Sequence, residues 1–441
     1  MSNPKFSIVI PTRNRIQTLQ YAIKTCLNQD FEDYEIIVSD NFSTSDTQEV
    51  VEKFKDDRIV FVRTNQPLAM SENWDYAISH VHGDYVILIG DDDGLLLNSL
   101  SYLDKVIDST NERVIRWEWI LYYWPDFFIK NVAGKIYIPM SNGLTELNST
   151  EIIKKVANYE LHYKTLPMLY NSAVHSSILK KIKEKNGIFF NSQTPDIYSG
   201  FVIAKSVKKY LSINTPLSIA GLSKSSNGAA QLYTNQISNI KEDFTKLNYK
   251  AGLTWHTKVP SVNVLPAIIA DSYYHAKDKL FPDEEDAIDY PRLVKNCIKE
   301  ITNFPQVQFE DLDKIKSKCI KNPELMDLIE FEYRKNLIIS KNKLKLKRIL
   351  SKIFGEYLKY PYLLFFDTII INLESLGILN AYDAAEFLKF CHFPEDFGIT
   401  SSSSKFFIKK LYDNLQINRK FNSLRKKYDY HKEVAVSGTG K

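Results

Sequence analysis

The sequence YVILIGDDDG, Tyr85–Gly94, combines an apolar run suited to a buried strand with three consecutive aspartates. Two carboxylates about 4 Å apart repel by about 4 kcal/mol at an effective dielectric constant near 20, so a cation nearby would be strongly favoured. Clustered aspartate oxygens suit a hard divalent ion that also binds substrate phosphates. In isolation, this stretch fits a ligand site and a solvated acidic turn equally well.

The residues before this stretch alternate between expected strands and expected helices. Apolar runs at Phe6–Ile10, Tyr34–Asp40 and Arg58–Thr64 are expected strands, and helical periodicity follows the first, as in Ile16, Leu19, Ile23 and Leu27. This alternation predicts an α/β fold with a doubly wound, mostly parallel sheet.

Polar residues follow three of these strands. Arg13 and Arg15 follow the first strand, Asp40 ends the second, and Asp91, Asp92 and Asp93 follow the fourth. Because the carboxyl ends of parallel strands meet at one edge, we expect these side chains to share a crevice. The two arginines also precede a helix N-terminus, which favours an anion. The sequence contains no GxGxxG after the first strand and no P-loop motif, which disfavours dinucleotide-binding and P-loop folds.

In this order, FSIVIPTRNR, the strand ending in VSD, and GDYVILIGDDD resemble the nucleotide-sugar-binding half of family 2 glycosyltransferases, which have the GT-A fold. The resemblance is clear from Phe6 to about Leu100 and weakens towards Leu222. It implies that Pro11, Thr12 and Arg13 line the nucleotide pocket. It also implies that Asp40 hydrogen-bonds the base and that Asn73 lies beside the sugar or ribose.

The resemblance further implies that the aspartates bind ribose and a Mg²⁺ or Mn²⁺ ion held by the diphosphate. Two registers are open. A literal DxD motif uses Asp91 and Asp93, whereas a GDD alignment places Asp91 on ribose and Asp92 on the metal. The Leu-rich segment that follows favours the second register, with Asp92 as metal ligand and Asp93 as the next candidate.

Three later residues are further candidates. Asp196 follows Thr194 and Pro195 at an expected helix start, where the dipole stabilises an anion able to take a proton from a sugar hydroxyl. The resemblance implies that this Asp is the catalytic base; the alternative is a plain helix N-terminal residue. Lys224 lies in a Gly- and Ser-rich stretch that suits either a loop over a diphosphate or a linker. His256 is a candidate third metal ligand, or a packing residue.

The aromatic segment Val114–Trp124 has two interpretations. Aromatic faces stack on sugar rings, which would suit an acceptor wall, but a strand that pairs aromatic residues in the core is the favoured interpretation. The sequence alone does not sort Trp117, Trp119, Tyr122 and Trp124 between these roles.

From about Pro260 the pattern becomes helical, so we expect three regions: a GT-A-like domain at 1–257, a helical domain at 258–432 for acceptor, membrane-surface or oligomer contacts, and a disordered tail at 433–441. The segment Tyr333–Gly355 is basic and amphipathic, typical of a core-packed helix or of one lying on an anionic membrane. No apolar run reaches the length of a membrane span.

Composition narrows the class of protein. The 441 residues are 44% hydrophobic and 25% charged, and the net charge of +4 gives no argument for nucleic acid. Cys26, Cys297, Cys319 and Cys391 form no CxxC pair, and the N-terminus shows no signal peptide, so we expect reduced thiols and a cytoplasmic protein, alternatively at the inner face of the membrane.

The resulting hypothesis is a metal-dependent, inverting glycosyltransferase. The donor would be a nucleoside-diphosphate sugar, with a UDP-sugar favoured, and the acceptor a surface polysaccharide, another glycan or a lipid-linked glycan. Two alternatives stay open: a nucleotidyltransferase that releases pyrophosphate, and a non-catalytic scaffold with a degenerate transferase domain.

Overall fold

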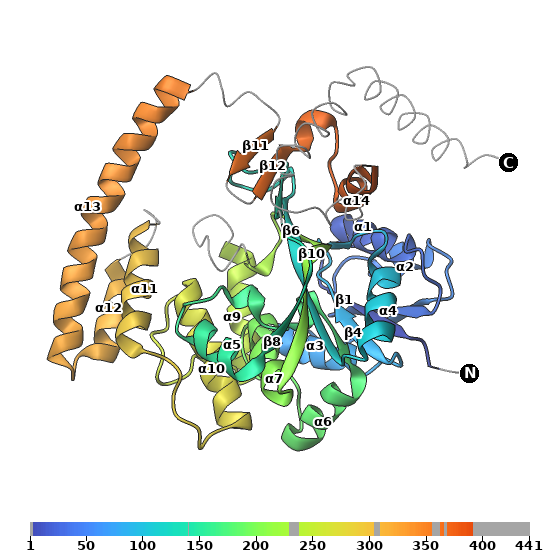
Figure 1. Cartoon of the computed structure of the whole chain (residues 1–441), viewed down its shortest axis with the longest axis horizontal. Coiled ribbons are helices and arrows are strands. Elements are labelled where there is room, and N and C mark those ends of the chain that lie inside the picture. The colour runs from blue at the N-terminus through green and yellow to red at the C-terminus, as the bar shows by residue number, and fades with distance from the viewer. Residues whose placement is uncertain are drawn as a thin grey trace. The chain divides into compact units, whose positions relative to one another are not determined.

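The structure, a computed structural model, describes residues 3–139, 141–228, 238–303, 309–354, 362–365 and 368–390. It contains one compact unit, Met1–Phe387, and a second, Leu388–Lys441. The predicted tail at 433–441 lies outside the described residues. The account below concerns the first unit (Figure 1).

The first ninety residues form the alternating pattern that the sequence predicts. The elements are β1 (Phe6–Thr12), α1 (Ile16–Leu27), β2 (Tyr34–Asp40), α2 (Thr47–Glu52), β3 (Ile59–Arg63), α3 (Met70–Ile78) and β4 (Tyr85–Leu88). Strands β4, β1, β2 and β3 are neighbours in that order and parallel. In this register Thr12 pairs with Asp40, so the polar residues after β1 and β2 meet at one edge, as predicted.

The next segment extends this sheet with strands that pair in both parallel and antiparallel orientation, and it covers the sheet with helices. Its elements are β5 (Gly94–Leu95), α4 (Ser99–Thr110), β6 (Val114–Tyr123), β7 (Lys135–Pro139), β8 (Leu144–Asn148), α5 (Ser149–Ala157), β9 (Ser172–His175), α6 (Ser176–Asn186), α7 (Pro195–Ser206) and β10 (Lys209–Leu222). Strand β9 lies between β4 and β6 and is antiparallel to both. One core packs α1 and α4 against the sheet, and a second core packs α3, α5 and α7 on its other face (Figure 1).

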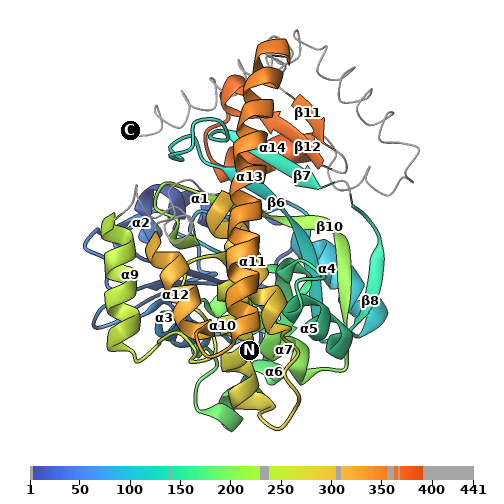
Figure 2. The ribbon, with the colours of Figure 1, turned by 90° about the vertical axis from the view of Figure 1, so that its left-hand side faces the viewer.

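The second half is mainly helical, as predicted. It contains α9 (Ser238–Lys250), α10 (Leu265–Leu280), α11 (Tyr290–Asn303), α12 (Phe309–Cys319), α13 (Pro323–Phe354) and α14 (Ala381–Phe390). Figure 2 shows α13 running beside α11 and α12. Ala267 and Ile268 of α10 belong to the same core as Phe201 of α7. The predicted boundary after residue 257 stays a prediction; the residues on both sides of it, up to Phe387, lie in one compact unit.

Two short strands also occur in this half, which the helical pattern did not predict. Strands β11 (Tyr362–Phe365) and β12 (Thr368–Asn372) form an antiparallel pair, and β12 adds to the edge of β7. Three consecutive isoleucines at 369–371 explain the strand, because β-branched residues favour extended backbone. The sheet therefore reaches from β3 to a hairpin more than three hundred residues later in the chain.

Two further expectations concern surfaces. Among the described residues, no helix is both long and apolar enough to cross a membrane. Helix α13 runs through the basic segment, but the side chains from position 340 lie outside the description, so core packing and membrane contact both stay open. Cys26, Cys297 and Cys319 are buried free thiols, and Cys391 lies outside the described residues.

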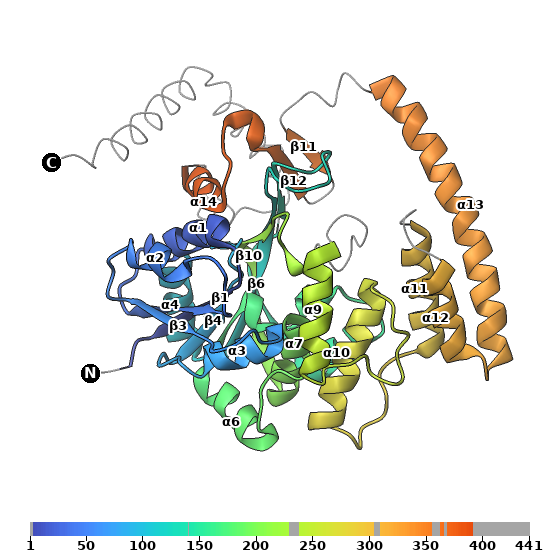
Figure 3. The same cartoon turned by 180° about the vertical axis from the view of Figure 1, so that it is seen from behind.

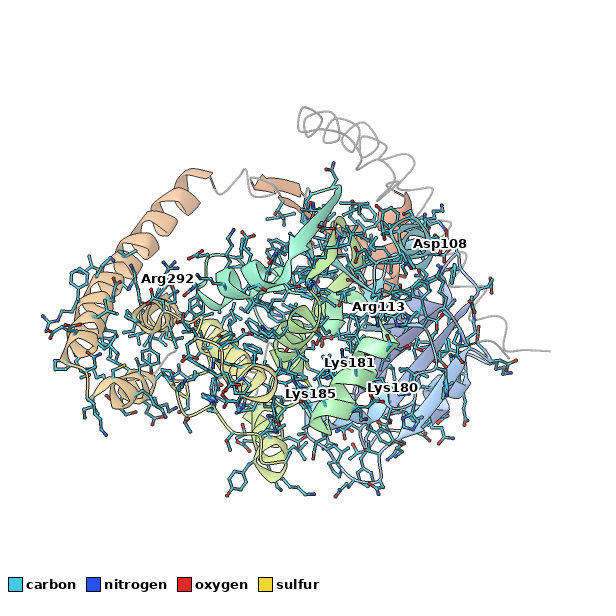
Figure 4. The ribbon with its side chains drawn as sticks, turned by 60° about the horizontal axis from the view of Figure 1, so that its bottom comes forward. Asp108, Arg113, Lys180, Lys181, Lys185 and Arg292 are labelled. Atoms are coloured by element: carbon cyan, nitrogen blue, oxygen red, sulfur yellow. The ribbon has the colours of Figure 1, made fainter. Side chains whose placement is uncertain are left out.

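A separate basic group lies at the amino-terminal end of the sheet. Lys180, Lys181 and Lys185 project from α6, and Arg113 precedes β6 nearby (Figure 4). Helix α6 begins where the Ser176 N–H donates to Asp84, the residue before β4. These cations therefore lie at the edge opposite the carboxyl ends of β1 and β4.

Candidate active site

A cavity of about 1010 Å³ opens at the carboxyl ends of β1 and β4. Its walls come from these two strand ends, from α3, β6, β7 and the start of α7, and from the end of β10 with the loop after it. Helix α9 adds a further wall and lies beside α3 in the rear view (Figure 3). The position agrees with the sequence expectation for ligand binding in an open α/β sheet.

Asp91 is held by two residues that follow or end β1. Thr12 Oγ1 donates to Asp91 Oδ2 over 2.6 Å, and Arg15 Nη1 donates to Asp91 Oδ1 over 3.0 Å. The carboxylate is 2% exposed, and the arginine supplies the opposite charge that a buried carboxylate needs. The first aspartate of the run is therefore fixed by the chain itself, while still lining the cavity.

Asp92 lines the cavity with one oxygen engaged. Its Oδ2 accepts the N–H of Ser223 over 3.1 Å and the Ser223 hydroxyl over 2.7 Å. Burial, and then the charge of Asp91, raise the pKa of Asp92 to about 6. A cation beside Oδ1 would offset this destabilisation of the anion.

Asp93 faces away from the cavity. Its two oxygens accept the N–H of Gly90 over 2.5 Å and the N–H of Gly221 over 2.7 Å, and Tyr170 also donates to it. Burial, and then the charge of Asp92, raise its pKa to about 8. A Cβ at Gly221 would lie 1.8 Å from the Asp92 carbonyl oxygen, so only glycine permits this contact. Asp93 thus fastens the aspartate turn to β10, and this geometry favours the register in which Asp91 and Asp92 face the ligand.

The remaining residues that were predicted to contact a nucleotide divide into two groups. Pro11, Thr12, Arg13, Arg15 and Asn73 line the cavity, and their contact with a nucleotide stays a prediction. Asp40 is fully buried at the same edge but does not line it, because Arg63 pairs with its Oδ2 at 2.8 Å and Ser43 donates to its Oδ1.

Arg13 joins two walls of the cavity. Its Nε donates to Asp243 of α9 over 3.1 Å, and its Nη1 donates to the Asn41 carbonyl over 2.8 Å. An anion in the cavity would therefore compete with Asp243 for this guanidinium.

Asp196 lines the cavity from the first turn of α7, after Thr194 and with Pro195 at the first helical position. Burial raises the pKa of this carboxyl above its usual value, and the backbone N–H groups of Ile197 and Asp196 partly offset that rise. Its charge also reaches the hydroxyls of Tyr163 and Tyr170, whose pKa values are raised mainly by burial. A group of this kind is suited to accept a proton.

Two predicted residues lie outside the cavity lining. Lys224 is exposed, and its backbone N–H donates to the Asp126 carboxylate. The same loop reaches the cavity through Asn227 instead, whose side-chain oxygen accepts from Arg15 over 3.0 Å. His256 stacks on Tyr274 and interacts with Asp278 at 3.0 Å. Within the described ranges, no group of three His, Cys, Asp or Glu side chains could hold a metal ion.

Several lining residues escaped the sequence analysis. Asn227 and His162 line the cavity from loops, Tyr163 from a single 3-10 turn and Asp243 from α9, and no motif in the sequence marks these four residues. Strand alternation could have separated Trp119, Leu121 and Tyr123, which line the cavity, from the fully buried Tyr122.

Comparison with known proteins gives matches to the N-terminal region. Residues 7–166 match the family model described as glycosyl transferase family 2. A Campylobacter jejuni relative, named GalNAc(5)-diNAcBac-PP-undecaprenol beta-1,3-glucosyltransferase, is 43% identical over 23% of this chain and 33% of its own length. The abequosyltransferase RfbV of Salmonella typhimurium is 34% identical over 23% of this chain and 32% of its own length.

These alignments thus span about a third of each curated relative. A crystal structure of S. aureus TarS 1–349 in complex with UDP-GlcNAc covers 78% of this chain and 92% of its own, at 14% identity and a TM-score of 0.41. That score adds no support to the fold described above.

Proposed function

Because the chain carries a glycosyl transferase family 2 domain over residues 7–166, we propose that it transfers a sugar from a nucleoside-diphosphate sugar to a glycan acceptor, with inversion. The observation that carries this proposal is that Asp91, Asp92 and Asp196 line one cavity together with Arg13 and Arg15. An acidic pair, two cations and a separate base are the groups that such a transfer requires.

The donor would occupy the half of the cavity formed by the ends of β1 and β4. Arg13 and Arg15 would bind the diphosphate, and Asn73 and Asp91 would contact the ribose or sugar. Asp40 would act through the turn it holds in place, because its carboxylate is already paired with Arg63. Lys224, whose side chain is exposed, stays a prediction as a further diphosphate contact.

A divalent ion, Mn²⁺ or Mg²⁺, fits this half of the cavity. The chain offers Asp92 Oδ1, a carboxylate oxygen whose neighbour Oδ2 is fixed by Ser223. A site with one or two protein carboxylates, completed by phosphates and water, is typical of Mg²⁺ with nucleotides. Such an ion would stabilise the negative charge on the leaving diphosphate. We leave Asp93 and His256 out of this site, because neither lines the cavity and their polar atoms are engaged elsewhere.

Asp196 would accept the proton of the attacking hydroxyl. Its raised pKa makes it a stronger base than an exposed aspartate, while the first turn of α7 keeps the anion accessible. The acceptor would be a surface-polysaccharide or lipid-linked glycan; the name of the Campylobacter jejuni relative gives an undecaprenol-linked glycan as the acceptor of that protein. A UDP-sugar is the favoured donor.

Incubation with UDP- and GDP-sugars, Mn²⁺ and glycan acceptors tests this proposal through release of the nucleoside diphosphate. We expect release that depends on Mn²⁺ and on Asp196. Release of pyrophosphate from a nucleoside triphosphate, or no turnover together with no metal-dependent nucleotide binding, would overturn it.

A further inference from the structure

One wall of the cavity is built from aromatic residues on two adjoining strands. The register between β10 and β6 shifts between Ile213 and Ser218, and beyond that shift alternate residues of β6 face the cavity: Trp119, Leu121 and Tyr123. Tyr137 of β7 pairs with Leu121, and its ring centre is 5.5 Å from that of Tyr123. We call Trp119, Tyr123 and Tyr137 the aromatic wall.

The inner end of the aromatic wall lies beside the proposed base. The Trp119 ring contacts Tyr163 at 6.5 Å and Tyr170 at 5.9 Å between centres. Tyr170 donates to Asp93, and the charge of Asp196 reaches both tyrosines. Trp119 therefore contacts two tyrosines that adjoin the aspartate turn and Asp196, and it lines the same cavity as Asp92 and Asp196, where the reacting sugar of an acceptor would have to be held.

The outer end extends well beyond a single sugar ring. Trp119 and Tyr123 are four residues apart on β6, about 13 Å at the usual rise of a strand. Tyr137, Pro139 and Thr368 continue the lining there. The cavity volume of about 1010 Å³ is at the upper end of the range of roughly 300–1,000 Å³ for ligand pockets, so a donor leaves room for a second ligand.

His162 adds a polar group to this part of the cavity. Its Nδ1 accepts the N–H of Lys164 over 3.2 Å, so the proton of the neutral ring lies on Nε2. Partial desolvation by its neighbours, and then the charge of Lys164, lower its pKa to about 4, although the residue keeps contact with solvent. The ring therefore stays neutral near pH 7 and offers an N–H donor of the kind that fixes a sugar hydroxyl.

We propose that the aromatic wall is an acceptor groove for an oligosaccharide of at least two rings, with the reacting ring at Trp119 and a neighbouring ring at Tyr137. This rests on the proposed function and names its acceptor class. Aromatic faces stack on the apolar faces of sugar rings, whereas purely structural aromatic residues are enclosed. Trp117 and Tyr122 are fully buried, but Trp119, Tyr123 and Tyr137 keep partial exposure towards the cavity.

The test measures how binding depends on acceptor length. An array of bacterial-type glycans, graded from one to four rings, is probed with the full chain in the presence of UDP and Mn²⁺. We expect binding to increase from one ring to two by about fivefold to tenfold, the effect of one aromatic contact. If the wild-type chain bound monosaccharides and longer glycans equally throughout the array, this result alone would overturn the proposed acceptor groove.

Substitutions at Tyr137 test whether this residue causes the increase of binding with glycan length. Tyr137→Ala should remove the increase with length, and Tyr137→Phe, which keeps the ring face, should restore it. Tyr249→Ala is the matched control, because Tyr249 is 80% exposed on α9 and does not line the cavity. Retention of the length preference in Tyr137→Ala would contradict the inference. Titration of UDP with Mn²⁺ on the same samples separates the acceptor groove from the proposed function. If the wild type bound no nucleotide, the proposed function would be refuted rather than the groove.

Discussion

The guanidinium of Arg15 and the carboxylate of Asp91 form an ion pair of 3.0 Å, although 76 residues separate them in the chain. The pair forms because β1 and β4 are adjacent and parallel, so the residues after them meet at one edge. It lies almost fully out of water, where charges depend on their partners. This contact therefore supports both the fold at the sheet edge and the charge balance of the cavity.

Arg15→Ala should destabilise the protein by about 3–5 kcal/mol, because it leaves Asp91 buried and uncompensated. Urea unfolding measures this change. Adding Asp91→Asn to the same chain should recover much of the loss, because the unpaired charge is then removed. Arg113→Ala, an exposed arginine at the opposite sheet edge, is the control and should change stability by less than about 0.5 kcal/mol (Figure 4). Equal losses for both arginines would contradict the role assigned to the pair.

Asp93→Asn should distinguish a structural aspartate from a metal ligand. The substitution replaces one side-chain oxygen by an NH2 donor, which cannot accept the N–H of Gly90 or Gly221, so a loss of about 1–3 kcal/mol is expected. Mn²⁺-dependent nucleotide binding should persist in the folded variant. Loss of metal dependence with unchanged stability would instead support the literal DxD register.

The pH dependence of stability should reveal Asp93 as well. Its pKa in the folded state is about 8, far above its usual range near 4, so the folded state holds the proton more tightly than the unfolded state. Its contribution to stability is therefore present at low pH and is lost as pH rises towards 8. The difference in unfolding free energy between wild type and Asp93→Asn should shrink from pH 5 to pH 8. A constant difference would contradict the raised pKa.

The sequence predicted the parallel sheet and the meeting of its polar strand ends, because both follow from strand order and periodicity. It also predicted that Asp91, Asp92 and Asp196 belong to a site, and the structure places all three in one cavity. It could not predict that the Arg63 guanidinium forms an ion pair with the Asp40 carboxylate, or that Asp93 accepts two backbone N–H groups. Both are contacts between segments that are distant in the sequence. Nor could it predict the β12 strand, whose pairing with β7 depends on tertiary contact.

Asp196→Asn should reduce transfer by about 10²–10⁴, the usual contribution of a general base, while leaving UDP–Mn²⁺ binding intact. Initial rates with saturating donor and a nucleotide titration make this comparison. Asp311→Asn removes a first-turn aspartate from α12, which does not line the cavity, and is the matched control. Equal loss of transfer and nucleotide binding in Asp196→Asn would indicate a structural role instead.

Asp243→Asn should strengthen nucleotide binding by about twofold to fivefold. Asp243 pairs with Arg13 at a partly exposed site, where such pairs contribute about 0–1 kcal/mol, and the substitution frees the guanidinium for the diphosphate. Glu242→Gln makes the same charge change on the same helix outside the cavity lining and should have a smaller effect. Isothermal titration provides the values, and weaker binding in Asp243→Asn would contradict competition for Arg13.

The most direct measurement is titration of UDP and GDP into wild type and Asp92→Asn, each with and without Mn²⁺. Wild type should bind one of these nucleotides only weakly without Mn²⁺ and at least about tenfold more tightly with it, and Asp92→Asn should lose this gain. Equal nucleotide affinity in Asp92→Asn and wild type with Mn²⁺, or no nucleotide binding by the wild type at all, would contradict the site.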